Sequence, residues 1–84
     1  MTTEEFSVLH CLEALGSKQG LIPHGISVKY LVEILYDEGM GMFESREITT
    51  ILVAMRRRKL VVSRPGGDGA LWLCTLYGSN VVSA

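Results

Sequence analysis

The 84-residue chain is long enough for one small domain and too short for two. Hydrophobic residues make up 48% of it and charged residues 20%, a composition that excludes intrinsic disorder as the main state. Its apolar runs are shorter than the roughly 20 residues of a membrane-spanning helix, and no signal peptide is visible. We therefore expect a single cytoplasmic domain over residues 1–84, with no membrane association.

The formal net charge of −1 conceals an uneven distribution of charge along the chain. Residues 1–45 carry two basic and seven acidic side chains, whereas residues 46–84 carry six basic and two acidic ones. Five of the eight basic residues lie within positions 56–64. A neutral total argues against a nucleic-acid partner, but a basic half of this kind keeps that class of partner open.

A first helix is predicted over about residues 3–15. Thr2 and Glu5 have the spacing of a capping box, and Gly16 is expected to end the helix. Apolar residues recur at i, i+3, i+4 and i+7, which predicts one buried stripe. The stripe consists of Val8, Cys11, Leu12 and Leu15.

Residues 16–26 are rich in turn formers and connect this helix to the next. Their apolar members predict that part of the segment packs down as a short strand. A second helix is expected over about residues 28–38 with Ser27 as its N-cap, and a third over about residues 45–58 with Ser45 as its N-cap. The predicted buried stripe of the third helix is Ile48, Ile51, Leu52 and Met55.

The pattern then changes to β-rich runs at residues 60–64 and 70–76, separated by the turn sequence Pro-Gly-Gly-Asp-Gly at 65–69. Two such runs around a Gly-rich turn predict a β-hairpin. Residues 77–84 are expected to form a cap, a frayed end or a short helix. The predicted fold class is therefore α+β, a three-helix bundle with a helix-turn-helix, followed by a two-stranded hairpin.

This order of elements resembles the winged-helix family, in particular the DNA-binding domains of regulators of the MarR and PadR type. The similarity is carried by residues 45–78. In such regulators, the recognition helix ends in a basic sequence that is followed by Leu-Val and the first wing strand. Here the basic sequence Met-Arg-Arg-Arg-Lys at 55–59 is followed by Leu-Val-Val. Residues 64–69 match the wing turn, and Leu-Tyr-Gly at 76–78 is similar to the family's exit from the second wing strand. The turn at 39–44 is longer than the roughly 3–4 residues usual for the turn of a helix-turn-helix.

The resemblance implies sequence-specific binding of double-stranded DNA by the third helix, and the side-chain pattern favours it. The major groove, about 12 Å wide, admits one α-helix with one face packed and the other carrying hydrogen-bond donors. Such helices read bases mainly with their N-terminal part. The residues expected to contact bases are Arg46, Thr49, Thr50 and Val53. The residues expected to contact phosphates are Ser45, Arg56, Arg57, Arg58, Lys59 and Arg64.

Two observations keep a second interpretation of the basic run open. Four consecutive basic residues at a helix end are also typical of a solvated terminus, because cations there interact favourably with the helix dipole. Glu44 and Glu47 lie at the helix start, where they would repel phosphate, cap the helix or accept a hydrogen bond from cytosine. The pattern as a whole favours DNA binding.

A regulator this small is expected to act as a homodimer, because a dimer binds two half-sites and doubles the contacts of one domain. Apolar residues outside the main stripe of the first helix, together with the tail, offer a dimer surface. They are Phe6, Leu9, Val81 and Val82. The alternative is that a small domain buries both faces of its first helix. By analogy with the family, we expect a small transcriptional regulator of viral, phage or plasmid type.

The main alternative function is a winged-helix module that binds another protein without binding DNA. The acidic faces of the first two helices, with an exposed Tyr30, suit that role. A fold of this kind does not determine which of the two functions is present. The dependence of duplex binding on salt distinguishes them.

Catalytic and metal-binding patterns are not evident. Cys11 and Cys74 are the only cysteines and are expected to be buried free thiols, with a disulfide or redox sensor as the alternative. Together with His10 and His24 they match no zinc spacing. The glycine run at 66–69 lacks the Gly-Lys-Ser/Thr ending of a phosphate loop. The chain is therefore expected not to be an enzyme and to use no metal, cofactor or small-molecule ligand.

Overall fold

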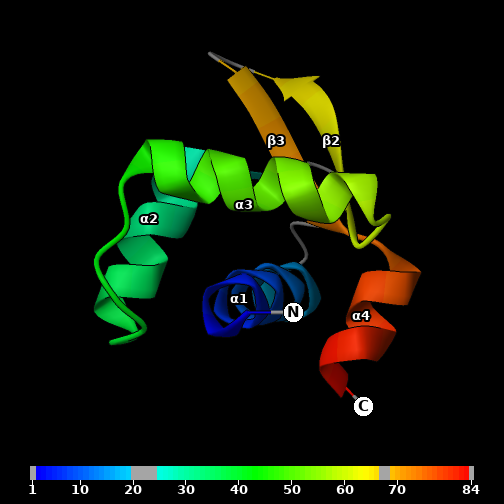
Figure 1. Cartoon of the computed structure of the whole chain (residues 1–84), viewed down its shortest axis with the longest axis horizontal. Coiled ribbons are helices and arrows are strands. Elements are labelled where there is room, and N and C mark those ends of the chain that lie inside the picture. Colours follow the sequence, from blue (N-terminus) through cyan, green and yellow to red (C-terminus); the bar gives the residue numbers. More distant parts are fainter. Residues whose placement is uncertain (1, 20–24, 67–68, 84) are drawn as a thin grey trace.

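A computed structural model describes residues 2–19, 25–66 and 69–83 of the chain. Within them, helices α1, α2 and α3 come before a hairpin and a last helix (Figure 1). The elements, in chain order, are α1 (Thr3–Gln19), β1 (Ile26–Ser27), α2 (Val28–Asp37), α3 (Ser45–Arg57), β2 (Val61–Gly66), β3 (Gly69–Cys74) and α4 (Leu76–Ser83). The predicted α+β class is confirmed by this arrangement.

The strands form one antiparallel sheet in the order β1-β3-β2. The hairpin register pairs Val61 with Cys74 and Gly66 with Gly69. The short strand expected between the first two helices is present as β1, which pairs Ile26 with Trp72 of β3. Because β1 leads directly into α2, this pairing holds the start of α2 beside the hairpin.

The core lies where α1, α2 and α3 pack against one another and against the sheet. Its fully buried side chains are almost all aliphatic, and each contributes about 1.5–3 kcal/mol by leaving water. No polar or charged side chain of the described residues is buried. The largest fully buried side chains are Leu9, Leu12, Leu31, Leu35, Ile48, Leu52, Met55 and Leu60.

The start of α1 is as predicted, but its end is not. The Thr2 N–H donates to Glu5 Oε1 at 2.8 Å and the Glu5 N–H donates to Thr2 Oγ1 at 3.1 Å, which completes the capping box. The helix then continues through Gly16 to Gln19. A glycine inside a helix costs only about 1 kcal/mol, and packing of the rest of the helix overcomes a cost of that size.

The N-cap of α2 is Ser27, as predicted, because its Oγ accepts the Tyr30 N–H at 3.2 Å. The N-cap predicted for α3 is wrong by one residue. Glu44 is the N-cap and Ser45 is the first helical residue. The Glu44 N–H donates to Glu47 Oε1 at 3.0 Å, so a carboxylate three residues into the helix satisfies the backbone there.

Helices α2 and α3 end in the same way. In each, the residue two positions beyond the helix has left-handed backbone, Gly39 with φ 72° and Lys59 with φ 64°. The Met40 N–H donates to the Leu35 carbonyl at 2.9 Å, and the Leu60 N–H to the Met55 carbonyl at 3.0 Å. These are Schellman ends, which turn the chain sharply out of the helix.

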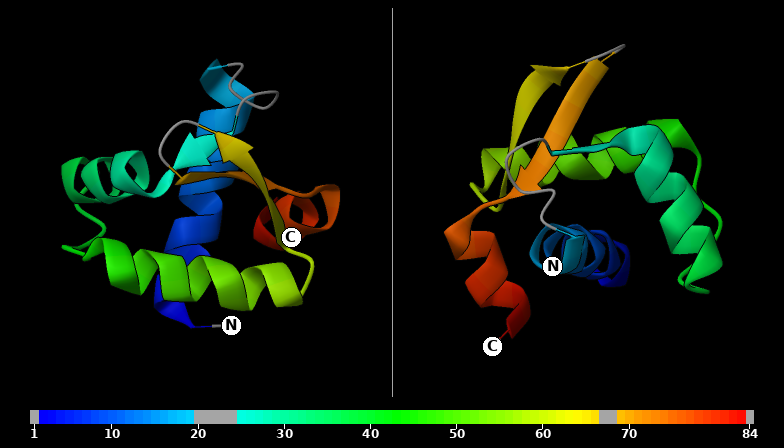
Figure 2. Two further views of the ribbon diagram at one scale, coloured as in Figure 1. Left: turned by 90° about the horizontal axis from the view of Figure 1, so that it is seen from above. Right: turned by 180° about the vertical axis from the view of Figure 1, so that it is seen from behind.

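The tail forms α4, and the second hairpin strand accordingly ends at Cys74 rather than at residue 76. The Thr75 hydroxyl lies 2.8 Å from the Lys59 carbonyl oxygen and 2.9 Å from that of Leu60, and it accepts the Gly78 N–H at 2.9 Å. This side chain therefore joins the start of α4 to the end of α3. Figure 2 shows α4 and α2 on opposite sides of the molecule, with α1 between them.

None of the helices in the described part of the chain is both long enough and apolar enough to cross a membrane.

Candidate nucleic-acid interface

Helix α3 has one buried and one exposed face. Ile48, Leu52 and Met55 are fully buried against α1, α2 and the sheet. Arg46, Thr49, Thr50 and Arg57 are exposed. The helix lies across one side of the molecule with the hairpin rising beside it (Figure 1). The structure thus confirms the two-faced helix that the 3.6-residue period predicts.

The two threonines expected to contact bases already use their hydroxyl protons. Thr49 Oγ1 donates to the Ser45 carbonyl at 2.8 Å and Thr50 Oγ1 to the Arg46 carbonyl at 3.0 Å. Their lone pairs and methyl groups remain at the surface, so they are arranged to accept hydrogen bonds. Val53, the fourth residue of that set, is half-buried and packs against the edge of the core.

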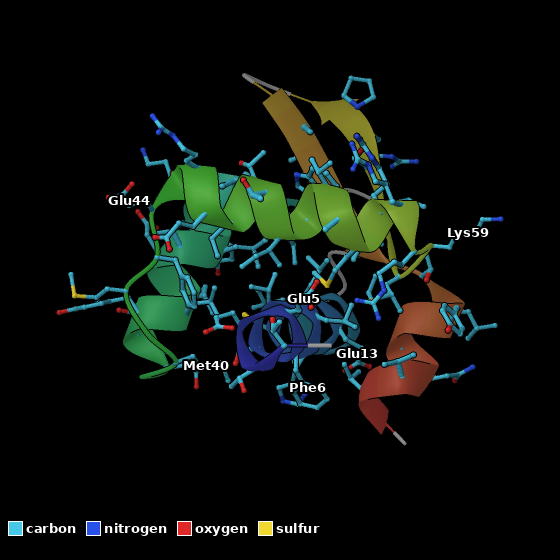
Figure 3. The ribbon with its side chains drawn as sticks, viewed as in Figure 1. Glu5, Phe6, Glu13, Met40, Glu44 and Lys59 are labelled. Carbon is cyan, nitrogen blue, oxygen red and sulfur yellow. The ribbon has the colours of Figure 1, made fainter. Side chains whose placement is uncertain are left out.

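Beyond the exposed first half of α3 lies a group of exposed basic residues, which we call the basic edge. It covers the end of α3, the turn that follows and β2. Its members are Arg56, Arg57, Arg58, Lys59 and Arg64. Lys59 projects from this end of the molecule, away from α2 (Figure 3).

Arg56 connects α3 to the hairpin. Its Nη1 donates to Ser63 Oγ at 2.7 Å, and its Cζ lies 5.3 Å from the centroid of the Trp72 ring. Trp72 is itself buried. A guanidinium over an indole face is a favourable cation–π arrangement, so Arg56 holds the hairpin against the helix as well as adding charge to the surface.

Arg58 is paired with the first helix. Its Nη1 lies 3.6 Å from Glu5 Oε2. The pKa of Glu5 lies below its usual value, first because the Thr2 N–H donates to the carboxylate, and further because of the Thr2 hydroxyl and the charge of Arg58. The Arg57 side chain, by contrast, makes no hydrogen bond or ion pair with any described residue, and its guanidinium is open to a ligand.

Ser45 is exposed but lies far from the basic edge. It begins a helix of 13 residues, and the rise of about 1.5 Å per residue places the two helix ends about 20 Å apart. Glu47, whose carboxylate accepts the Glu44 N–H, caps this end, as the sequence allowed. Any phosphate held near Ser45 is therefore a different one from those near Arg57.

A groove of about 540 Å³ lies between the start of α2, the side of α3 and the hairpin. Lys29 and Thr49 both line it. No local signal in the sequence connects Lys29 with the hairpin. Pairing of β1 with β3, a contact between distant segments, brings it there. The groove is lined by Ser27, Val28, Lys29, Thr49, Gly66, Gly69, Ala70, Leu71 and Trp72.

The surface expected to form a dimer is changed by the structure. Leu9 is fully buried, so it cannot contribute to an exposed surface, because α1 contacts α2, α3, β3 and α4 together. Val81 and Val82 are half-buried and pack against the core. Phe6 remains exposed and stacks on His10, with ring centroids 6.1 Å apart. The sequence pattern missed two exposed apolar residues of α4, Leu76 and Tyr77.

The cysteines are free thiols, with Cys11 in the core and Cys74 half-buried. Burial raises the pKa of each to about 11, assisted by the charge of Glu38 near Cys11 and of Glu13 near Cys74.

Tyr30 is half-buried rather than exposed as expected. No cluster of metal-ligating side chains occurs within residues 2–19, 25–66 and 69–83. His24 and positions 67–68 of the predicted hairpin turn lie outside these ranges.

The observed architecture, four helices and a three-stranded antiparallel sheet within the described residues, is compatible with a small winged-helix-like fold. The chain was compared with family models, with curated proteins and with solved structures. No family model matches it, and no curated protein or solved structure is significantly similar.

Proposed function

We propose that this chain is a winged-helix domain that binds double-stranded DNA through α3 and regulates transcription. The observation that carries the proposal is the division of α3 along its length. Its first half exposes Arg46 and the two threonines, the half-buried Val53 follows, and the basic edge begins one turn later at Arg56. An amphipathic helix with a basic end supports insertion into the major groove.

Within this proposal, the two ends of α3 have different roles. Arg46, Thr49 and Thr50 contact bases, because the N-terminal part of such a helix reaches furthest into the groove. Arginine suits guanine, whereas the threonine oxygens suit the amino groups of adenine or cytosine. Arg57 and the rest of the basic edge contact phosphates, which adds affinity with little dependence on sequence.

The groove between α2 and the hairpin extends the proposed DNA contact. Lys29 is exposed on one wall of the groove and Thr49 on the other. With Thr49 beside a base, a backbone phosphate of the same duplex lies within reach of Lys29. Lys29 is thus a seventh phosphate-contacting residue in addition to the six that the sequence indicated.

A homodimer completes the proposal, because the net charge of −1 gives a single domain little overall attraction for DNA. The exposed apolar side chains of α1 and α4 supply a surface for it, namely Phe6, Leu76 and Tyr77. A dimer of this kind would bind half-sites about 34–36 Å apart, one turn of the duplex.

Selection of random duplexes by the purified chain, repeated at two salt concentrations, tests the proposal. We expect a defined sequence to be enriched, and its affinity to fall steeply with salt as counterions are released. Arg57→Ala should weaken binding to every duplex and reduce the slope of log K against log salt by about 1. Tyr36→Glu, an exposed change on α2 with the same effect on net charge, should leave binding unchanged. Binding that is independent of salt, or equal loss in both variants, would refute the proposal.

Sedimentation tests the dimer. The protomer mass is 9.2 kDa, so a species of twice that mass at micromolar concentration is expected. Leu76→Ser should shift it to the protomer, because Leu76 is 81% exposed and contributes nothing to the core. A protomer mass for the unmodified chain, alone and on DNA, would overturn this part of the proposal only.

A further inference from the structure

A second surface lies at the other end of the molecule from the basic edge. The end of α2 and the following turn expose three large apolar side chains, Tyr36, Met40 and Met42. Tyr36 is 61% exposed and Met42 is 83% exposed. Exposed methionines are adaptable contacts and are enriched in protein interfaces. Met40 lies at this end and Lys59 at the opposite end (Figure 3).

A pocket of about 200 Å³ adjoins Met40, between α1 and the end of α2. Met40 and Glu38 form part of its rim, and Leu15 and Ile34 contribute apolar wall. Small-molecule sites have volumes of about 300–1,000 Å³, so this pocket is below that range. Its size suits one bulky side chain of a partner. The pocket is lined by His10, Cys11, Ala14, Leu15, Ile34, Glu38 and Met40.

The charge around these apolar residues has one sign. Residues 33–44 include four acidic side chains and no lysine or arginine. All four are exposed, namely Glu33, Asp37, Glu38 and Glu44. Glu38 also lies close enough to the pocket that its charge helps to raise the pKa of Cys11, after burial. A partner group that enters the pocket therefore meets a carboxylate at its rim.

This charge excludes two occupants. Duplex DNA is repelled by an acidic surface. A second copy of the chain offers its basic edge, but that edge lies at the far end of the molecule (Figure 3). If the basic edge of one copy docks on the acidic end of the next, each pair still has one free basic edge and one free acidic end. Further copies can then add at both, and the contacts continue into open filaments instead of closing. The remaining occupant is a basic segment of a different protein.

We propose that Met40 and the adjoining pocket form a docking surface for a basic, amphipathic segment of another protein. One bulky apolar side chain of that segment enters the pocket, and its lysines or arginines lie against Glu38 and the neighbouring carboxylates. Because this docking surface and the basic edge are at opposite ends, the partner binds without occupying α3. The inference does not depend on DNA binding.

Selection from a display library of short random peptides tests it. The unmodified chain is the target, and the Glu38→Lys, Met40→Ser double variant is used to remove peptides that bind elsewhere. Both positions are exposed, and lysine at the end of α2 suits the helix dipole, so the double variant should fold normally. We expect the enriched peptides to combine a large apolar residue with at least two nearby basic residues.

The affinity of the strongest peptide is then measured by fluorescence anisotropy. Each single variant should weaken it by about tenfold or more, as expected for central interface residues. Val62→Ser is the matched control, since Val62 is an exposed apolar residue, like Met40, but lies on β2. Arg57→Glu should leave peptide binding intact, which separates this inference from the DNA proposal. Failure to enrich peptides, enrichment of acidic ones, or equal affinity for the variants overturns it.

Discussion

The guanidinium of Arg58 lies 3.6 Å from the carboxylate of Glu5, which joins the end of α3 to the first turn of α1. Glu5 belongs to the capping box of α1, where it accepts the Thr2 N–H. One positive charge of the basic edge is therefore partly neutralised inside the domain. Because the Arg58 side chain is half-exposed, water screens this pair and its contribution to stability is small, about 0–1 kcal/mol, so its effect on a charged ligand is the more informative quantity.

Replacing Glu5 by glutamine is expected to strengthen DNA binding. Glutamine preserves the capping box, but it releases Arg58 and removes a negative charge beside the basic edge. We expect affinity to rise about two- to fivefold and the salt slope to steepen by about 1. Anisotropy titrations at several salt concentrations measure both. Glu4→Gln removes an equal charge from the adjacent exposed position, and an identical gain there would show that net charge alone is responsible.

Replacing Arg56 by alanine is expected to reduce stability as well as DNA affinity. The change removes the hydrogen bond to Ser63 and the cation–π contact with Trp72, together worth about 1–2 kcal/mol. Urea denaturation measures the free energy of unfolding. Arg57→Ala is the comparison, because Arg57 has no partner among the described residues. If the two variants are equally stable, Arg56 does not hold the hairpin.

Lys59 is the residue at which glycine should increase stability. Its φ of 64° is unfavourable for a residue with a side chain, by about 1 kcal/mol. Lys59→Gly should raise the free energy of unfolding by about 0.5–1 kcal/mol while weakening DNA binding through the lost charge. Gly39→Ala is the reverse experiment in the matching position of α2, where nothing surrounds a methyl group, and it should be destabilising by a similar amount. Stability changes of the opposite sign would contradict the assignment of both helix ends.

Gly78 should tolerate no side chain. A methyl group there would overlap the Leu60 carbonyl oxygen and contact the Cys74 sulfur, so α4 would have to move away from the end of α3. Gly78→Ala should lower the free energy of unfolding by about 2 kcal/mol or more, within the range of overpacked sites. Gly69→Ala is the control, because a methyl group at Gly69 meets open space. If thermal denaturation shows little loss of stability for Gly78→Ala, α4 packs less closely against the end of α3 than described.

The two thiols should react slowly in the folded protein and should affect stability at alkaline pH. Burial raises the pKa of Cys11 and Cys74 from 9.0 to about 11. At pH 8 the native thiols should be alkylated at least about tenfold more slowly than in urea, because the thiolate is the reactive form. A raised pKa stabilises the folded state below pH 9, and this contribution is lost as pH rises toward 11. Equal rates of alkylation in buffer and in urea would contradict the burial of both groups.

Local signals in the sequence predicted most of the secondary structure. Thr2 and Ser27 cap helices where the capping patterns placed them, and the two β-rich runs pair as a hairpin, although its strands extend into the predicted turn to Gly66 and Gly69. These features depend on residues within about four positions of one another, so the sequence contains the whole cause. The end of α1 was mispredicted because Gly16 is a local signal that the packing of the whole helix outweighs.

The sequence by itself determined the division of charge, the two-faced α3 and the run of basic residues at its end. Only the tertiary structure decided how those residues are used. It buries Leu9, which local periodicity placed on a second surface, and it ties Arg56 to the hairpin and Arg58 to α1. It also brings Lys29 to the groove and leaves Met42 exposed beside acidic residues. These outcomes depend on contacts between segments far apart in the chain, whose register and packing no local pattern specifies.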